Sequence, residues 1–301
     1  MTVRVAYLGP AGTFSQAAAA CYVERYYRDP AAAPVELLPC PTIPDTLTAL
    51  ADSRAAEALL PLENALEGSV PLVLQALLDD PAIKVRGEVV LPIEQCLLGL
   101  PGATVDRLEG IITYPHALAQ CRRFLASHLP GRKVEEASST AAGARLVAER
   151  GDPRWAAIGP EVAAGIYGLV VLVRGIHDEK GNATRFIAVG RDDRPPSPGG
   201  RDKTSLILLP EHDRPGLLHD LLGEFARHQI NLTRIESRPS RRRLGEYVFF
   251  VDCLGHRLVP PLCDVIEALG SGGETRVRVL GSYPVWDEPA GSGKMGPSPS
   301  K

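Results

Sequence analysis

The chain has 301 residues, a formal charge of −3 and a sequence pI of about 6.2, and 45% of its residues are hydrophobic. This length has room for two or three domains. The slightly acidic charge excludes the overall basic footprint of a nucleic-acid-binding protein. No apolar run is long enough for a membrane span, and the first residues enter a strand pattern without a signal-peptide region. We therefore expect a cytoplasmic protein that binds neither nucleic acid nor membrane.

Cysteine and histidine spacing gives no sign of a metal site. The six cysteines form no Cys-x-x-Cys pair, and the seven histidines are scattered. We also find no nucleotide P-loop, nucleophile elbow or cofactor fingerprint. We therefore expect neither a metal nor a cofactor.

The first 190 residues alternate short apolar runs with helical segments. Strand-like runs lie at 3–8, 58–62, 95–99, 110–113, 156–158 and 169–173, and helical segments at 15–27, 117–129 and 139–150. This βα alternation predicts an α/β domain with an open, largely parallel sheet. In such sheets ligands bind beyond the carboxyl ends of the strands.

A second, smaller unit follows a linker. Residues 191–202 are polar and rich in Pro and Gly, which is typical of a linker. Residues 203–285 then follow the order βαββαβ, the ferredoxin-like pattern. Residues 286–301 have the composition of a disordered tail. Because the linker separates two units, we predict that deleting residues 203–301 leaves the activity of the first unit intact.

The segment 182–186 places a possible proton donor on a strand. Strand alternation directs Thr184 and Phe186 to one face and Arg185 to the other. A strand gives a catalytic group rigid support. Taken alone, however, Thr-Arg-Phe is also an ordinary β-rich tripeptide.

Further polar residues stand at strand ends and helix starts. Residues 9–15 form a strand–turn–helix junction, and helix N-termini attract anions. Each such motif alone is more typical of a helix cap or a surface turn than of a ligand site. Together they predict a cleft for a small anion, suited to a reaction that needs positioning and one proton donor, such as elimination or decarboxylation.

Six of these segments occur in the order found in bacterial monofunctional prephenate dehydratases, which the chain resembles from residue 3 to residue 283. They are residues 9–15, 61–70, 114–121, 139–142, 182–186 and 236–239. The resemblance implies conversion of prephenate to phenylpyruvate, with loss of water and carbon dioxide, on the route to L-phenylalanine.

The resemblance also implies a fold and an assembly. The catalytic domain, residues 1–190, resembles type II periplasmic binding proteins, with a first lobe at about 1–76 and 176–190 and a second lobe at about 77–175. Residues 203–285 resemble an ACT domain, which in the family binds phenylalanine at a subunit interface and inhibits the enzyme. A homodimer or homotetramer is therefore expected.

The resemblance assigns roles to individual residues. Thr184 matches the proton or hydrogen-bond donor, and the other catalytic positions are Glu63, Asn64 and Gln120. The expected substrate-binding residues are Thr13, Phe14, Ser15, Ser69, Thr113, Ser139, Thr140, Arg185 (in a supporting role) and Phe186. The expected effector-binding residues are Asp213, Pro215, Gly216, Leu217, Leu218, Glu236, Ser237 and Arg238.

The chain departs from the family pattern at several places. Thr113-Tyr114-Pro115-His116 stands where the family commonly has Ser-His-Pro-Gln, and Leu217 stands where a smaller alanine is usual. The larger Leu217 is expected to narrow the effector pocket. Two alternatives stay open: an arogenate dehydratase, and a non-catalytic amino-acid sensor.

Overall fold

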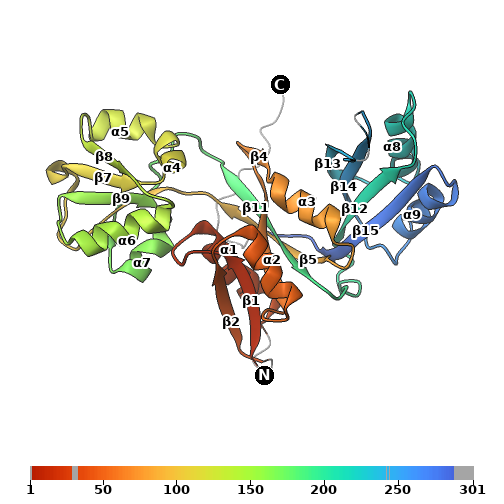
Figure 1. Ribbon diagram of the computed structural model, residues 1–301, viewed down its shortest axis with the longest axis horizontal. Coiled ribbons are helices and arrows are strands. Elements are labelled where there is room, and N and C mark those ends of the chain that lie inside the picture. The colour runs from red at the N-terminus through yellow and green to blue at the C-terminus, as the bar shows by residue number, and fades with distance from the viewer. Residues whose placement is uncertain (1, 29–32, 242, 244, 288–301) are drawn as a thin grey trace.

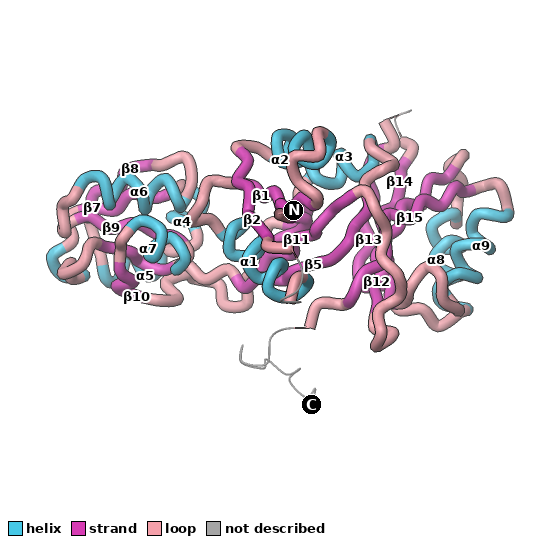
Figure 2. The backbone as a smooth tube through the Cα atoms, turned by 90° about the horizontal axis from the view of Figure 1, so that it is seen from below, coloured by secondary structure: helices cyan, strands magenta, loops and turns pink. Residues whose placement is uncertain are grey.

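The computed structural model describes residues 2–28, 33–241, 243 and 245–287. Three bodies lie in a row: the second lobe, the first lobe and a C-terminal domain (Figure 1). The view from below shows the same row, with the first lobe in the middle (Figure 2). In this part of the chain, no helix is long and apolar enough to cross a membrane.

The first lobe is built on a mixed sheet. Its strands lie in the order β2 (Val35–Cys40), β1 (Val3–Leu8), β3 (Glu57–Asn64), β11 (Ala183–Gly190) and β5 (Lys84–Pro92), with β4 (Gly68–Ser69) paired to β3. The first three strands run parallel, but β11 is antiparallel to both β3 and β5. The predicted, largely parallel sheet is therefore corrected to a mixed one.

Helices cover both faces of this sheet because each strand alternates two apolar sets. Leu59, Phe186 and Ala188 pack under α1 (Phe14–Tyr26). Leu60, Ile187 and Val189 belong to the opposite core, which α2 (Ile43–Ala51) and α3 (Pro71–Asp79) cover. The sheet thus forms the middle layer of the lobe.

The second lobe has its own five-stranded sheet. Its order is β10 (Val170–Val173), β6 (Cys96–Gly99), β9 (Trp155–Gly159), β7 (Gly110–Thr113) and β8 (Lys133–Glu136). The helical elements of this lobe are η1 (Val105–Arg107), α4 (Pro115–Ala119), α5 (Arg122–His128), α6 (Thr140–Arg150) and α7 (Glu161–Tyr167). Segments 93–95 and 174–182 connect it to the first lobe.

The predicted boundary between the lobes is wrong by about one strand. The expected second lobe began at residue 77, but β5 pairs with β11 along its whole length in the first-lobe sheet. The sequence reading missed β5 as a strand, so it could not assign the strand to a sheet. The second sheet begins at Cys96.

The C-terminal domain has the predicted βαββαβ order. Its elements are β12 (Asp202–Pro210), α8 (Leu217–Arg227), β13 (Leu232–Pro239), β14 (Tyr247–Leu254), α9 (Leu262–Ser271) and β15 (Thr275–Pro284). The antiparallel sheet has the order β13-β14-β12-β15, and both helices pack on one of its faces. The predicted fold class, a two-lobed α/β domain followed by a ferredoxin-like domain, is confirmed.

The other face of this C-terminal sheet packs on the first lobe. Ile207, Phe250 and Tyr283 share one apolar core with Leu74 and Val85 of the lobe. Strand β15 approaches β5 so closely that a Cβ on Gly281 would lie 2.2 Å from the Val85 carbonyl oxygen. The two units are therefore one packed body, and the expectation that the first functions without the second lacks structural support.

The predicted linker and tail are also attached at several points. Asp193 pairs with Arg257 at 2.8 Å, and the Arg194 guanidinium donates to the Tyr22 hydroxyl at 3.2 Å. Trp286 lies within the described residues, where the Arg25 guanidinium stacks 4.9 Å from its ring centre. Residues 286 and 287 of the predicted tail therefore belong to the described structure, and residues 288–301 lie outside the described part of the chain.

Candidate active site

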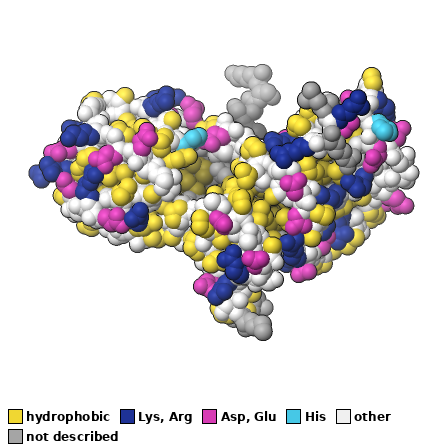
Figure 3. Space-filling model, in the orientation of Figure 1, with side chains coloured by type: hydrophobic (Ala, Val, Ile, Leu, Met, Phe, Trp, Pro, Cys, Tyr) yellow, Lys and Arg dark blue, Asp and Glu magenta, His cyan; other side chains and the backbone are white. Residues whose placement is uncertain are grey.

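A cleft of about 460 Å³ lies between the two lobes. Its walls come from the ends of β3 and β11 in the first lobe and from α4 and the start of α6 in the second. Figure 3 shows the hollow, whose visible floor is hydrophobic or uncharged. Nine of the predicted site residues line it: Thr13, Phe14, Ser15, Asn64, Gln120, Ser139, Thr140, Thr184 and Phe186.

The central polar contact joins two neighbouring strands. Asn64 Nδ2 donates to Thr184 Oγ1 at 2.9 Å and to Asn182 Oδ1 at 2.9 Å. Asn64 Oδ1 accepts the backbone N–H groups of Leu66 and Glu67 at 3.0 and 3.1 Å. The Thr184 hydroxyl is therefore an acceptor toward Asn64, and its proton is left for a ligand in the cleft.

A β-bulge brings Asn64 into the cleft. Along β11, Arg185 pairs with Glu63 but the next residue, Phe186, pairs with Pro61. Leu62 is thus an extra residue on β3, and the side-chain alternation reverses across it. Asn64 consequently shares the cleft face with Thr184, while Glu63 shares the opposite face with Arg185.

A second polar chain spans the cleft from one lobe to the other. Gln120 Nε2 donates to Glu67 Oε1 at 3.2 Å, and Gln120 Oε1 accepts from Gln95 Nε2 at 3.1 Å. His116 Nδ1 lies 3.0 Å from the same Glu67 oxygen. The sequence reading missed Glu67 and Gln95; that Glu67 lies three residues after Asn64 was the available signal.

Two helix N-termini, one from each lobe, face the cleft. Thr13 caps α1 by accepting from the Gln16 N–H, and Ser139 caps α6 by accepting from the Ala142 N–H at 3.0 Å. Residues 13–15 and 138–140 line the same cleft. Among the described residues that line it, none is Lys or Arg. The positive potential available to an anion therefore comes from the helix ends, together with His116 when it is protonated.

Cys121 follows Gln120 but carries no reactive thiolate. Its side chain is fully buried, and burial raises the pKa of the thiol to about 12. At neutral pH the group is a protonated core residue. Residues 2–287, apart from the few gaps given above, contain no cluster of three potential metal ligands.

Four predicted site residues lie outside the cleft. Thr113 is fully buried, and its hydroxyl donates to the Ile158 carbonyl at 3.1 Å. Glu63, Ser69 and Arg185 all point to the opposite face of the first-lobe sheet, where they contact the C-terminal domain. For Glu63 the bulge at Leu62 is the reason, and for Arg185 it is ordinary strand alternation.

Arg185 is the centre of a buried ionic cluster. Its guanidinium contacts Glu88 at 2.8 Å, Asp252 at 2.5 Å and the Tyr283 hydroxyl at 2.8 Å. Burial by itself lowers the pKa of Arg185, but Asp252, Tyr283 and Glu88 together outweigh burial and hold that pKa well above its usual range. Burial likewise raises the pKa of Asp252, but the Arg185 charge and the hydrogen bonds from Ser205 and Arg185 together bring the net pKa below its ordinary value. Lys203 adds a second cation, 2.7 Å from Glu88.

The predicted effector residues fall into two groups. Asp213 and Leu217 line a small cavity of about 30 Å³, together with Glu246, Tyr247 and Phe249. Pro215, Gly216 and Leu218 flank it as exposed residues, with Gly216 capping α8 at a φ of 82°.

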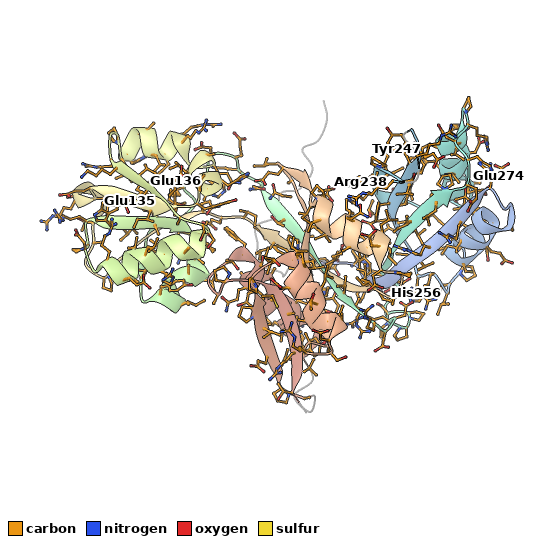
Figure 4. All side chains as sticks on the ribbon, in the orientation of Figure 1. Glu135, Glu136, Arg238, Tyr247, His256 and Glu274 are labelled. Atoms are coloured by element: carbon orange, nitrogen blue, oxygen red, sulfur yellow. The ribbon has the colours of Figure 1, made fainter. Side chains whose placement is uncertain are left out.

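Strand β13 carries the remaining three predicted effector residues on alternating faces. Ser237 points to the helix side, whereas Glu236 and Arg238 point toward the first lobe. Figure 4 labels Arg238 and Tyr247 near each other on β13 and β14. Glu236 and Arg238 therefore do not line the small cavity.

The fold and site define a two-lobed enzyme for a small anion, joined to a ferredoxin-like domain. A family model described as prephenate dehydratase matches residues 5–194, and one described as ACT domain matches residues 211–270. The chain is 38% identical over 287 residues to the prephenate dehydratase of Mycobacterium bovis (strain BCG / Pasteur 1173P2), covering 94% of this chain and 87% of that protein. The chain belongs to the prephenate dehydratase family, and a dehydratase is a lyase.

Solved structures agree with this assignment. A prephenate dehydratase from Arthrobacter aurescens in complex with L-Phe is 35% identical, with a TM-score of 0.80 and coverage of 94% of this chain and 90% of that one. A protein described as GqqA, a novel type of quorum quenching acylase, is 31% identical, with a TM-score of 0.78 and coverage of 95% and 98%. The fold is therefore shared by proteins of different described activity, so roles must be argued from the site.

Proposed function

We propose that the cleft converts prephenate to phenylpyruvate, with Thr184 as the hydrogen-bond donor to the departing ring hydroxyl. The observation that carries this proposal is the 2.9 Å bond from Asn64 Nδ2 to Thr184 Oγ1. It fixes the oxygen and leaves the proton free to point at substrate. A hydroxyl held on a strand is positioned for this task without any cofactor.

The two helix N-termini would bind the two carboxylates of prephenate. Thr13 and Ser139 begin α1 and α6, which belong to different lobes, so one dianion in the cleft would bridge the lobes. Each exposed helix end favours an anion by roughly 0.3–1 kcal/mol, and by up to about 2 kcal/mol when partly buried. This arrangement explains how a cleft without lysine or arginine in its lining attracts a dianion.

The chemistry follows from the substrate. The bond between the ring and its carboxylate breaks, carbon dioxide leaves, and the electron pair enters the ring as the carbon–oxygen bond to the hydroxyl breaks. The leaving hydroxide accepts a hydrogen bond from Thr184 and becomes water by taking up one proton, which comes from the solvent. A threonine hydroxyl is a weak acid, so orientation contributes more than proton transfer. Gln120, fixed between Gln95 and Glu67, would contact the substrate from the second lobe.

The test is to incubate the purified full chain with prephenate at neutral pH and to follow phenylpyruvate. Rapid conversion is the expected result. Failure with prephenate but rapid conversion of arogenate would replace the proposed substrate and keep the chemistry. Failure with both would contradict the proposal.

We also propose that L-phenylalanine inhibits this reaction through the ACT domain of a cytoplasmic homodimer or homotetramer. The Arthrobacter relative is described in complex with L-Phe. The cavity beside Asp213 and Leu217 measures about 30 Å³, room for about one water, so a second copy of the chain would have to complete an amino-acid site. Tyr247, which lines the cavity, is exposed and offers apolar surface to such a partner.

The effector proposal has its own experiment. Adding phenylalanine should lower the conversion of prephenate, and sedimentation should show at least a dimer. Rapid conversion without inhibition would support the catalytic proposal and indicate that Leu217 blocks effector binding. In that case Leu217→Ala should restore inhibition. A fully active monomer that phenylalanine inhibits would contradict a site shared between subunits.

A further inference from the structure

We infer that Arg234, a residue of the ACT domain, is a positioning residue for the reaction in the cleft. Arg234 contacts the end of β3 on the face opposite the cleft, and this strand end presents Asn64 to Thr184. This inference rests on the roles proposed above for Asn64 and Thr184. It makes the ACT domain a structural part of the active site as well as its regulator.

Arg234 lies on β13 with its side chain 8% exposed, and its guanidinium faces the first lobe. Its Nε is 3.2 Å from Glu63 Oε2, and its Nη2 donates to Ser69 Oγ at 2.9 Å. The same Nη2 contacts the Glu236 carboxylate. One planar guanidinium therefore connects two points of the first lobe, a geometry that arginine provides and lysine does not.

The two contacted residues are cross-strand partners at the end of β3. Glu63 pairs with Ser69, and Asn64 pairs with Gly68, which adopts a φ of 82° in the turn. Asn64 Oδ1 also holds the backbone of this turn through two N–H groups. Arg234 thus holds the hairpin on one face while Asn64 reaches Thr184 on the other.

The hairpin needs such support because it is small. Strand β4 has two residues, and a two-stranded hairpin is marginally stable by itself. The contacts of Ser69 are also concentrated on the ACT domain, since its hydroxyl donates to Glu236 and accepts from Arg234. Without Arg234, Glu63 would lose its salt-bridge partner, and the hairpin would lose its main polar contact with the ACT domain.

The same strand carries the predicted effector segment. Glu236 contacts both Arg234 and Ser69, while the next residue, Ser237, faces the helix side of the ACT sheet. A shift of β13 would therefore reach the hairpin through Arg234. This gives effector binding a direct mechanical path to Asn64.

The experiment measures kcat and KM for prephenate in the full-length protein. Arg234→Gln should lower kcat by about 10- to 100-fold, because a displacement of about 1 Å at a catalytic group can cost ~10²-fold, while KM changes by less than about threefold. Arg234→Lys keeps the positive charge but lacks the planar guanidinium that contacts two groups at once, so it should recover part of kcat. The matched control is Arg257→Gln, which removes another ion pair of the ACT domain, that with Asp193 at 2.8 Å, away from the hairpin. It should leave kcat unchanged.

The outcomes separate this inference from the proposed function. If the wild-type protein does not convert prephenate or arogenate, the proposed function fails before Arg234 is tested. If the wild type is active and Arg234→Gln keeps the full kcat, or Arg257→Gln lowers kcat equally, the positioning role is overturned. If Arg234→Gln does not fold, Ser69→Ala removes a single contact and should lower kcat by about two- to fivefold at constant KM; an unchanged kcat in that variant would also overturn the inference.

Discussion

The two faces of the paired strands β3 and β11 differ sharply in chemistry. On the cleft face, Asn64 and Thr184 are uncharged and share one hydrogen bond. On the opposite face, their immediate neighbours Glu63 and Arg185 are charged and bind residues of the ACT domain. Adjacent residues of one short motif thus serve two different parts of the molecule.

The comparison teaches that the charged members of a motif need not be the ones that meet a charged substrate. A buried ion requires partners on every side, so Arg185 is engaged by Glu88, Asp252 and Tyr283 and has no freedom to bind a ligand. The cleft instead relies on helix ends and neutral groups.

Deleting residues 203–301 should abolish folding of the remaining chain. It would expose the apolar core that Leu74, Leu77 and Val85 share with the ACT sheet, and it would leave Arg185 without Asp252. The expected result is an aggregated or unfolded product, seen by circular dichroism and gel filtration. A soluble truncated protein with wild-type turnover would support the sequence-based prediction that the two units are independent.

Arg185→Gln should lower the free energy of unfolding by about 3–5 kcal/mol, because it leaves buried carboxylates without their main partner. Denaturant unfolding of the variant measures this change. The control is Arg4→Gln, whose ion pair with Glu36 is half exposed and should be worth at most about 1 kcal/mol. Equal losses of unfolding free energy in the two variants would contradict the claim that the buried ion pairs of Arg185 stabilise the fold more than an exposed pair does.

Thr184→Val should lower kcat by ~10²-fold or more with little change in KM, since valine keeps the shape and removes the donor. Steady-state kinetics with prephenate provide the measurement. Thr48→Val, on the exposed side of α2, is the matched control and should behave as wild type. Near-normal turnover in Thr184→Val would dismiss Thr184 as the donor.

Acid should remove the contribution of Asp252 to stability. Its pKa is lower in the folded protein than in the unfolded chain, so its contribution is complete above about pH 4 and is lost as the pH falls through the folded value. The difference in unfolding free energy between wild type and Asp252→Asn should therefore be constant near neutrality. Below about pH 4 it should shrink by at most about 1.4 kcal/mol per pH unit. A difference that stays constant down to pH 2 would show that folding does not lower the pKa of Asp252.

His116→Gln should have the smallest effect. The His116–Glu67 pair spans the cleft, but both side chains are about half exposed, so solvent screens their attraction. We expect KM for prephenate to change by less than about fivefold, and the change to diminish in high salt. An increase in KM of tenfold or more would show that substrate binding needs a charged side chain on the cleft face.

Much of the fold could be predicted because it depends on local patterns. The βα alternation and the βαββαβ order of the ACT domain are both visible as runs of apolar residues and turn residues. The helix start at Ser139 follows from capping chemistry, whereas the first helix, predicted from residue 15, begins at Phe14 with Thr13 as its cap. The family resemblance pointed to Asn64, Gln120 and Thr184, three residues that the structure brings to one cleft.

The errors share one cause, which is that pairing between distant segments decided the outcome. The extra residue Leu62 in β3 became visible through its register against β11, and it separates Glu63 from Asn64. The place of β5 likewise depended on its pairing with β11. No local pattern shows which residues a second strand will oppose.

The sequence by itself determined the kinds of elements, their order and the residue types that can serve a small anion. The tertiary structure alone decided which of those residues meet the cleft and which meet the ACT domain. The physical reason is that a side chain on a strand has two possible faces, and the bulge, the neighbouring strands and the domain behind them select one. For Glu63 and Arg185 that selection made them part of the support behind the active site.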